Sequence, residues 1–142
     1  MISDGLLDFA VSRSALMFRP AAGVLKHPYI DPGGPYSENL WDWDSYWAAV
    51  ALFAIANERG DGRMLHKVKL HGRGSLLNFF EAQGEDGSLP ILMSPKDVDW
   101  FDSVGNSRNN MAKTVQALFL QLLWRNGAIE RDSARELLAG IR

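Results

Sequence analysis

The sequence predicts an all-α protein built from helical hairpins, and three observations lead to this fold class. Five segments carry helical patterns with their own start and stop signals, and no segment shows a convincing strand alternation. The apolar character of these five helices alternates along the chain. The connections between them alternate between long and short. We therefore expect helical hairpins that stack side by side in two layers.

Capping and breaking residues set the bounds of the predicted helices. The first begins after Ser3, a possible N-cap, and ends before Pro20. Glycines end the second and third helices, and Asn126-Gly127 ends the fourth. The expected ranges are 4–18, 44 or 45 to 59, 64–83, 110–125 and 131–139.

Two further features are expected within this helical frame. Gly72 and Gly74 lie inside the third helix, so the helix is expected to kink or break there. The segment "GSLPILM" looks extended, but it is short and contains Pro90. We expect it to form a loop.

The second and fourth helices differ from the other three in their apolar pattern. They read "SYWAAVALFAIAN" and "MAKTVQALFLQLLW" and are apolar on nearly every side, whereas the first, third and fifth have a wet face. A helix that is apolar all round is a buried helix. The predicted order is therefore outer, inner, outer, inner, outer, which is half of a two-layer arrangement of helical hairpins stacked side by side.

The two long connections both lead into inner helices. They span about residues 19–43 and 84–109, while the connections that leave the inner helices are short. Inner helices of such a stack run parallel, so the long loops gather at one end. Long loops at one end of a rigid scaffold commonly carry the functional site.

Composition excludes several classes of function. The chain has 142 residues, enough for one domain, with a net charge of −2, no basic stripe and no cysteine. Nucleic-acid binding, disulfides and cysteine-based metal sites are therefore not expected. His66 and His71 are spaced too far apart for one helix face, and we expect no metal or cofactor. The longest apolar run, residues 46–56, is shorter than the roughly 18 residues of a membrane span. No signal peptide is expected, which favours a cytoplasmic location.

The most informative motif is Trp41-Asp42-Trp43-Asp44, directly before the second helix. Either aspartate can cap the helix, which stabilises it by about 0.5–2 kcal/mol. A cap requires no tryptophan, however. Indole faces pack on the apolar face of a sugar ring, and carboxylates accept hydrogen bonds from its hydroxyls. The motif therefore has two interpretations, a helix cap and a sugar-binding surface.

Three segments resemble the (α/α)6 six-hairpin glycosidases. "LKHPYIDPGGPYSENLWDWDSYW" at 25–47 is similar to glycoside hydrolase family 63 and the mannosylglycerate hydrolase-like enzymes, and more distantly to trehalases. "NFFEAQGEDGSLPI" at 78–91 and "NNMAKTVQALFLQLLW" at 109–124 resemble later parts of the same domain. The resemblance implies that residues 1–142 are the N-terminal portion of one catalytic domain, an (α/α)6 barrel of which about five of the twelve helices are present. An incomplete ring leaves apolar surface of the inner helices open at its edges.

The resemblance also implies a reaction and a substrate pocket. Such enzymes hydrolyse α-linked glucosides or mannosides without a metal, usually with inversion. Tyr36, Trp41, Trp43 and Asp44 match positions that line the pocket for the sugar ring. Lys113 matches a polar position that reaches the same pocket, although Thr114 follows it where relatives often have proline.

The catalytic acid and base of this family are expected beyond residue 142, so the isolated chain is expected to be inactive. Within the chain, Asp44 with Asp99 or Asp102 is a weaker candidate pair. Two alternatives stay open: a non-catalytic sugar-binding module, and a helical scaffold whose Trp-Asp pairs only cap and plug. The expected partner is a carbohydrate, with no nucleic acid and no membrane. Self-association through the open edges is also expected.

Overall fold

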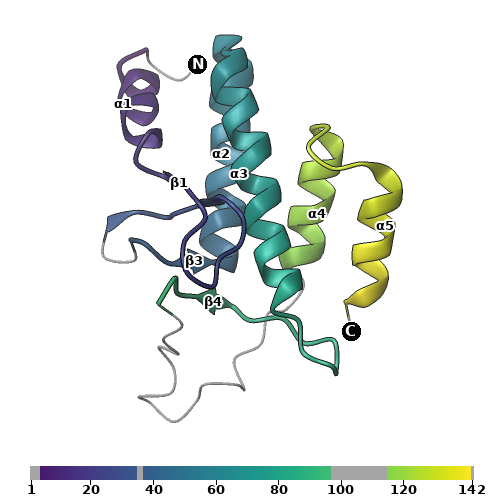
Figure 1. The fold of residues 1–142 in the computed structure, drawn as a ribbon. Helices are drawn as coiled ribbons and strands as arrows, with labels where there is room; N and C mark the ends of the chain where they lie inside the picture. The colour runs from purple at the N-terminus through teal and green to yellow at the C-terminus, as the bar shows by residue number, and fades with distance from the viewer. Residues whose placement is uncertain (1–3, 35–36, 97–114, 142) are drawn as a thin grey trace.

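The computed structural model describes residues 4–34, 37–96 and 115–141 as a mainly helical chain. Helices α2 to α5 stand side by side, and short strands lie toward one end of them (Figure 1). The helices are α1 (Asp4–Ser14), α2 (Asp42–Arg59), α3 (Gly62–Glu81), α4 (Val115–Arg125) and α5 (Arg131–Gly140). The strands are β1 (Phe18–Arg19), β2 (Tyr29–Ile30), β3 (Leu40–Trp41) and β4 (Leu92–Met93). The predicted mainly-α class is confirmed.

The four short strands correct the expectation that the chain forms none. β1 pairs antiparallel with β2, and Phe18 lies opposite Ile30, so the first helix ends at Ser14 rather than at Phe18. β3 pairs antiparallel with β4, which lies in the segment expected to be a loop. Each strand has two residues, too few for a period-two pattern to be visible in the sequence.

Helix α3 is continuous from Gly62 to Glu81, so the predicted break at its glycines is wrong. The two glycines instead allow close packing. A Cβ atom on Gly74 would lie 1.9 Å from the backbone oxygen of Pro28, and one on Gly72 would lie 2.9 Å from Leu123 Cδ2. Gly74 therefore lets the loop before β2 lie directly on the helix.

Two residues shape the turn between α2 and α3, and one of them was predicted. Gly60 adopts the left-handed conformation that ends α2, as expected. Asp61 then caps α3 by accepting hydrogen bonds from the backbone N–H groups of Arg63 and Met64. This cap accounts for the short turn between α2 and α3.

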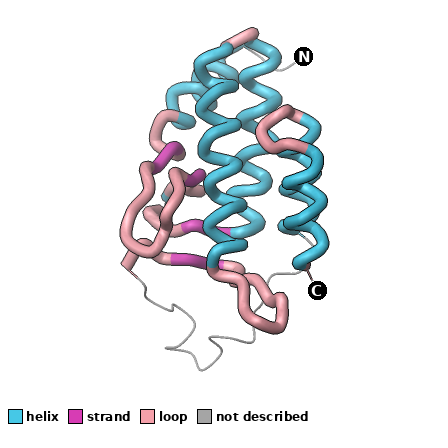
Figure 2. Tube along the Cα trace, turned by 45° about the vertical axis from the view of Figure 1, so that its right-hand side comes forward, coloured by secondary structure: helices cyan, strands magenta, loops and turns pink. Residues whose placement is uncertain are grey.

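The helices pack as stacked hairpins. α3 packs on α2 and α4, α2 also packs on α4 and α1, and α5 packs on α4. Figure 2 shows the helices roughly aligned with one another, with the strands to the left of them and below. No closed ring forms among the described helices. The (α/α)6 barrel therefore remains a proposal.

The two helices predicted to be inner, α2 and α4, are buried where they pack on each other and on neighbouring helices, and each also exposes large apolar side chains. The core joins them through residues such as Phe53, Phe119 and Leu123. Trp43 and Trp47 of α2 and Leu118 and Trp124 of α4 are exposed. This exposure agrees with the expectation of open apolar surface on these helices. None of the described helices is both long and apolar enough for a membrane span.

Candidate functional site

The two long connections meet at the N-terminal end of α2. β3 runs directly into α2 and pairs with β4 of the second connection. The backbone N–H of Asp42 donates to the carbonyl of Ile91 at 3.0 Å, and that of Val24 donates to Pro95 at 3.4 Å. As predicted, loop segments distant in sequence gather at this end (Figure 1).

A buried aspartate organises the first connection. Asp31 is fully buried and accepts hydrogen bonds from Arg19 Nε at 2.7 Å, from the Gly33 N–H at 2.6 Å and from the Glu38 N–H at 2.8 Å. Glu38 has a φ of 71°, a conformation rare for a residue other than glycine, and the Tyr29 hydroxyl donates to its carbonyl. Sequence reasoning missed this role of Asp31, although Asp-Pro-Gly-Gly is a recognisable turn signal.

Side chains of α2 and α3 fix the same connection to the helices. The Ser45 hydroxyl donates to the backbone carbonyl of Ile30 at 2.9 Å. The backbone N–H of Ile30 donates to Ser75 Oγ, also at 2.9 Å. The Asn78 side chain exchanges two hydrogen bonds with the backbone of His27, both at 3.0 Å. These bonds hold the loop rigidly before it reaches Trp41.

Trp41, not an aspartate, occupies the N-cap position of α2. Its backbone is extended and its side chain makes no capping hydrogen bond. The prediction that Asp42 or Asp44 occupies the N-cap position is therefore wrong. Asp42 is the first helical residue, and its Oδ1 accepts from the Trp43 N–H at 2.7 Å. One first-turn N–H is thus satisfied by a carboxylate, as the cap interpretation requires.

Asp42 is also an unusually placed carboxylate, since its residue is only 4% exposed. Burial raises the pKa of Asp42 to about 6, while the hydrogen bond from the Trp43 N–H and the nearby Gln116 side chain oppose the rise. The neighbouring Asp44 carboxylate adds to it. Gln116 of α4 is 1% exposed, and neither its amide atoms nor Asp42 Oδ2 has a well-formed hydrogen bond within the described part of the chain. A buried polar pair therefore lies beneath the surface at this end.

The outer surface at this end is aromatic and acidic. Trp43 is 42% exposed, and Asp44 beside it is exposed as well. The Tyr46 ring packs edge-on to Trp43 at 6.4 Å between centroids and lies 5.0 Å from the Trp47 ring. Its third aromatic neighbour is the buried Phe119 at 6.0 Å. The exposed indoles are thus supported from the core.

The structure describes three of the five residues predicted to bind sugar. Trp41, Trp43 and Asp44 all lie at the start of α2. The other two, Tyr36 and Lys113, and the weaker catalytic candidates Asp99 and Asp102 lie outside the described residues. Sequence reasoning noted Trp47 only as one of three tryptophans within seven positions, gave it no role in the site, and did not single out Gln116. Their signals were an indole four positions after Trp43 and a lone amide within an apolar helix.

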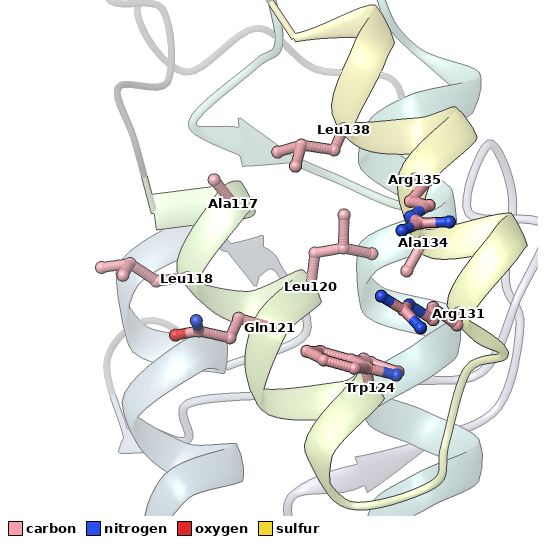
Figure 3. A pocket seen from close by; sticks show the side chains of 9 residues that line it. All are labelled: Ala117, Leu118, Leu120, Gln121, Trp124, Arg131, Ala134, Arg135 and Leu138. Carbon is pink, nitrogen blue, oxygen red and sulfur yellow. The ribbon is translucent and has the colours of Figure 1, made fainter.

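A second surface lies between α4 and α5. It is a groove of about 430 Å³ whose wall is mainly apolar (Figure 3). Its lining residues are Ala117, Leu118, Leu120, Gln121, Trp124, Arg131, Ala134, Arg135 and Leu138. None of Trp41, Trp43 and Asp44, the predicted sugar-binding residues that the structure describes, contributes to it.

No group of three or more metal-ligating side chains occurs within residues 4–34, 37–96 and 115–141. Comparisons of the chain with protein families, curated proteins and solved structures found no match.

Proposed function

We propose that this chain forms the sugar-binding part of a glycoside hydrolase that acts on α-linked glucosides or mannosides. The observation that carries the proposal is the exposed pair Trp43 and Asp44 at the end where both long connections meet. The family resemblance supports the same function, and an (α/α)6 barrel is the fold proposed for the complete domain.

The chemistry of the pair suits a pyranose ring. The exposed indole offers a flat apolar face for the C–H groups of the ring. An ionised carboxylate is an acceptor only, and its two oxygens can bind two neighbouring hydroxyls. Tyr46 supports the Trp43 ring from one side, so little side-chain entropy remains to be lost on binding.

The catalytic pair is a separate matter from the sugar surface. Inverting hydrolysis requires an acid and a base about 6.5–9.5 Å apart on opposite sides of the scissile bond. The raised pKa of Asp42 would suit a catalytic acid, but this carboxyl is buried and accepts a hydrogen bond from the Trp43 N–H in the first turn of its own helix. Its role is therefore to position Trp43. We propose that the acid and base are supplied by residues other than those described. The isolated chain is then expected to bind sugar without hydrolysing it.

A non-catalytic sugar-binding module is the second candidate. The surface of Trp43 and Asp44 also favours this candidate. It is formed by the described residues, and no catalytic acid and base are identified among them. Release of reducing sugar from a p-nitrophenyl α-glucoside or α-mannoside by a longer form of the protein would distinguish the hydrolase from the module.

Titration calorimetry tests sugar binding directly. Methyl α-glucoside, methyl α-mannoside and their α-linked disaccharides are titrated into the chain and into Trp43→Ala and Asp44→Ala. Each variant is expected to weaken binding about tenfold or more, a loss of ~1.4 kcal/mol.

Trp124→Ala is the matched control, because Trp124 has the same exposed fraction, 42%, but lies in the α4–α5 groove. It is expected to leave affinity unchanged. A chain that is folded by circular dichroism and binds none of these sugars would contradict the proposal.

A further inference from the structure

The side chain of Trp47 extends the exposed aromatic surface of Trp43 along α2. Trp47 lies four residues after Trp43, and residues at this spacing share a helix face, one turn or about 5.4 Å apart along the axis. It is 57% exposed, more than Trp43. Two large indoles exposed in succession form an apolar surface that needs a ligand or a partner to cover it.

The two indoles share one rigid support. Tyr46 contacts both rings, at 6.4 Å to Trp43 with planes 77° apart and at 5.0 Å to Trp47 with planes 59° apart. The same tyrosine packs edge-on against Phe119 of α4, which is buried. The positions of both exposed rings are therefore fixed through one side chain that reaches the core. A pre-arranged pair of rings loses little entropy when a flat ligand binds.

The polar and steric surroundings select among possible ligands. Asp44 is exposed and lies three residues before Trp47, so a carboxylate stands beside the rings and disfavours an anionic ligand. The next exposed positions on the helix, Ala51 and Ala54, carry small side chains. An extended ligand can therefore continue past Trp47. A neutral chain with hydroxyl groups and apolar ring faces fits these conditions.

We propose that Trp43 and Trp47 are successive stacking positions, so that the site binds an α-linked disaccharide or longer chain rather than a single sugar. One helical turn is comparable with the length of one pyranose unit, which places each ring of a disaccharide over one indole. The inference rests on the proposed sugar-binding function. Within it, Trp47 determines the preference for chain length.

The test compares two ligands on the same proteins. Methyl α-glucoside and maltose, and methyl α-mannoside and α-linked mannobiose, are titrated into the intact chain and into Trp47→Ala, Trp47→Phe and Trp43→Ala. Trp47→Ala is expected to weaken disaccharide binding about tenfold and to change monosaccharide binding less than twofold. Trp47→Phe retains a stacking ring and is expected to restore most of the disaccharide affinity. Trp43→Ala is expected to weaken both ligands.

The outcomes separate this inference from the proposed function. If Trp43→Ala weakens both ligands while Trp47→Ala leaves the disaccharide preference intact, the second stacking position is wrong and sugar binding stands. If no ligand binds to the folded chain, both are wrong. If Trp47→Ala abolishes a concentration-dependent dimer and leaves sugar affinity unchanged, the exposed indole is a contact between copies and the inference is overturned.

Discussion

Trp43 and Trp124 are equally exposed, yet the surfaces around them differ in almost every other respect. Trp43 is braced by the Tyr46 ring, follows a buried carboxylate and precedes an exposed one. Trp124 lies among leucines and faces the two arginines of α5 in the groove of Figure 3. The exposed fraction of a tryptophan therefore says little about its function. The charge and rigidity of its surroundings say more.

The difference in charge leads to different expected ligands. Carboxylate oxygens accept hydrogen bonds from sugar hydroxyls, and the ring support at α2 holds a flat surface ready. The α4–α5 groove offers aliphatic side chains and guanidinium donors. Such a groove is better suited to the apolar side chains of a protein than to a sugar.

The largest expected effect comes from Asp31→Ala. This change leaves the guanidinium of Arg19 and the N–H groups of Gly33 and Glu38 without their shared buried acceptor. We expect a loss of about 3 kcal/mol in the free energy of unfolding, measured by urea denaturation. Sugar affinity is expected to fall as well, because the loop that leads into Trp41 loses its shape.

Asp132→Ala is the matched control beside the groove. Asp132 is 91% exposed in its side chain and lies 3.8 Å from Arg135, an ion pair within one exposed helix. Its removal is expected to change the unfolding free energy by less than about 0.5 kcal/mol. Equal effects of the two variants would show that Asp31 does not organise the loop.

The sequence predicted the helices and the end at which the loops gather, because helical periodicity, glycine stops and loop lengths are visible along the chain. It did not predict that α3 is continuous through Gly72 and Gly74. Gly72 and Gly74 look like breaks locally, and only the positions of Leu123 and Pro28 explain them as close contacts.

The candidate site was predicted in part for a similar reason. Trp43 and Asp44 were identifiable from a four-residue motif. The burial of Asp42 against Gln116 depends on two helices meeting, and their separation in the sequence hides it. Asp31 acts through the backbone of a turn whose geometry no residue pattern specifies fully.

Asp42→Asn is expected to stabilise the chain rather than destabilise it, and its effect depends on pH. Burial raises the pKa of the folded carboxyl to about 6, above its ordinary value of 3.8, so the folded state binds the proton more tightly than the unfolded state. The ionised Asp42 therefore lowers the free energy of unfolding progressively as the pH rises from 3.8 to about 6. The full destabilisation remains at higher pH. The uncharged amide keeps an oxygen for the Trp43 N–H and avoids this cost.

The measurement is urea denaturation of both proteins at two values of pH. We expect Asp42→Asn to be about 3 kcal/mol more stable than the original chain near pH 8 and nearly equal to it near pH 4, because the pKa of Asp42 is raised by about two units at ~1.4 kcal/mol each. A difference that is the same at both values would mean that the carboxyl is not held in a raised-pKa site.

The smallest effect on stability is expected from Leu138→Arg, which tests the groove as a surface for self-association. Leu138 is 50% exposed, so the change is expected to alter the unfolding free energy by about 0.5 kcal/mol or less. It adds a third cation to a groove that already holds Arg131 and Arg135.

If copies of the chain associate through this groove, Leu138→Arg is expected to raise the dissociation constant of the association, measured by sedimentation velocity, about tenfold, or ~1.4 kcal/mol. Trp47→Arg makes the same kind of change on the proposed sugar surface and is expected to leave this dissociation constant unchanged. Association that resists Leu138→Arg but disappears with Trp47→Arg would reverse the roles assigned to the two surfaces.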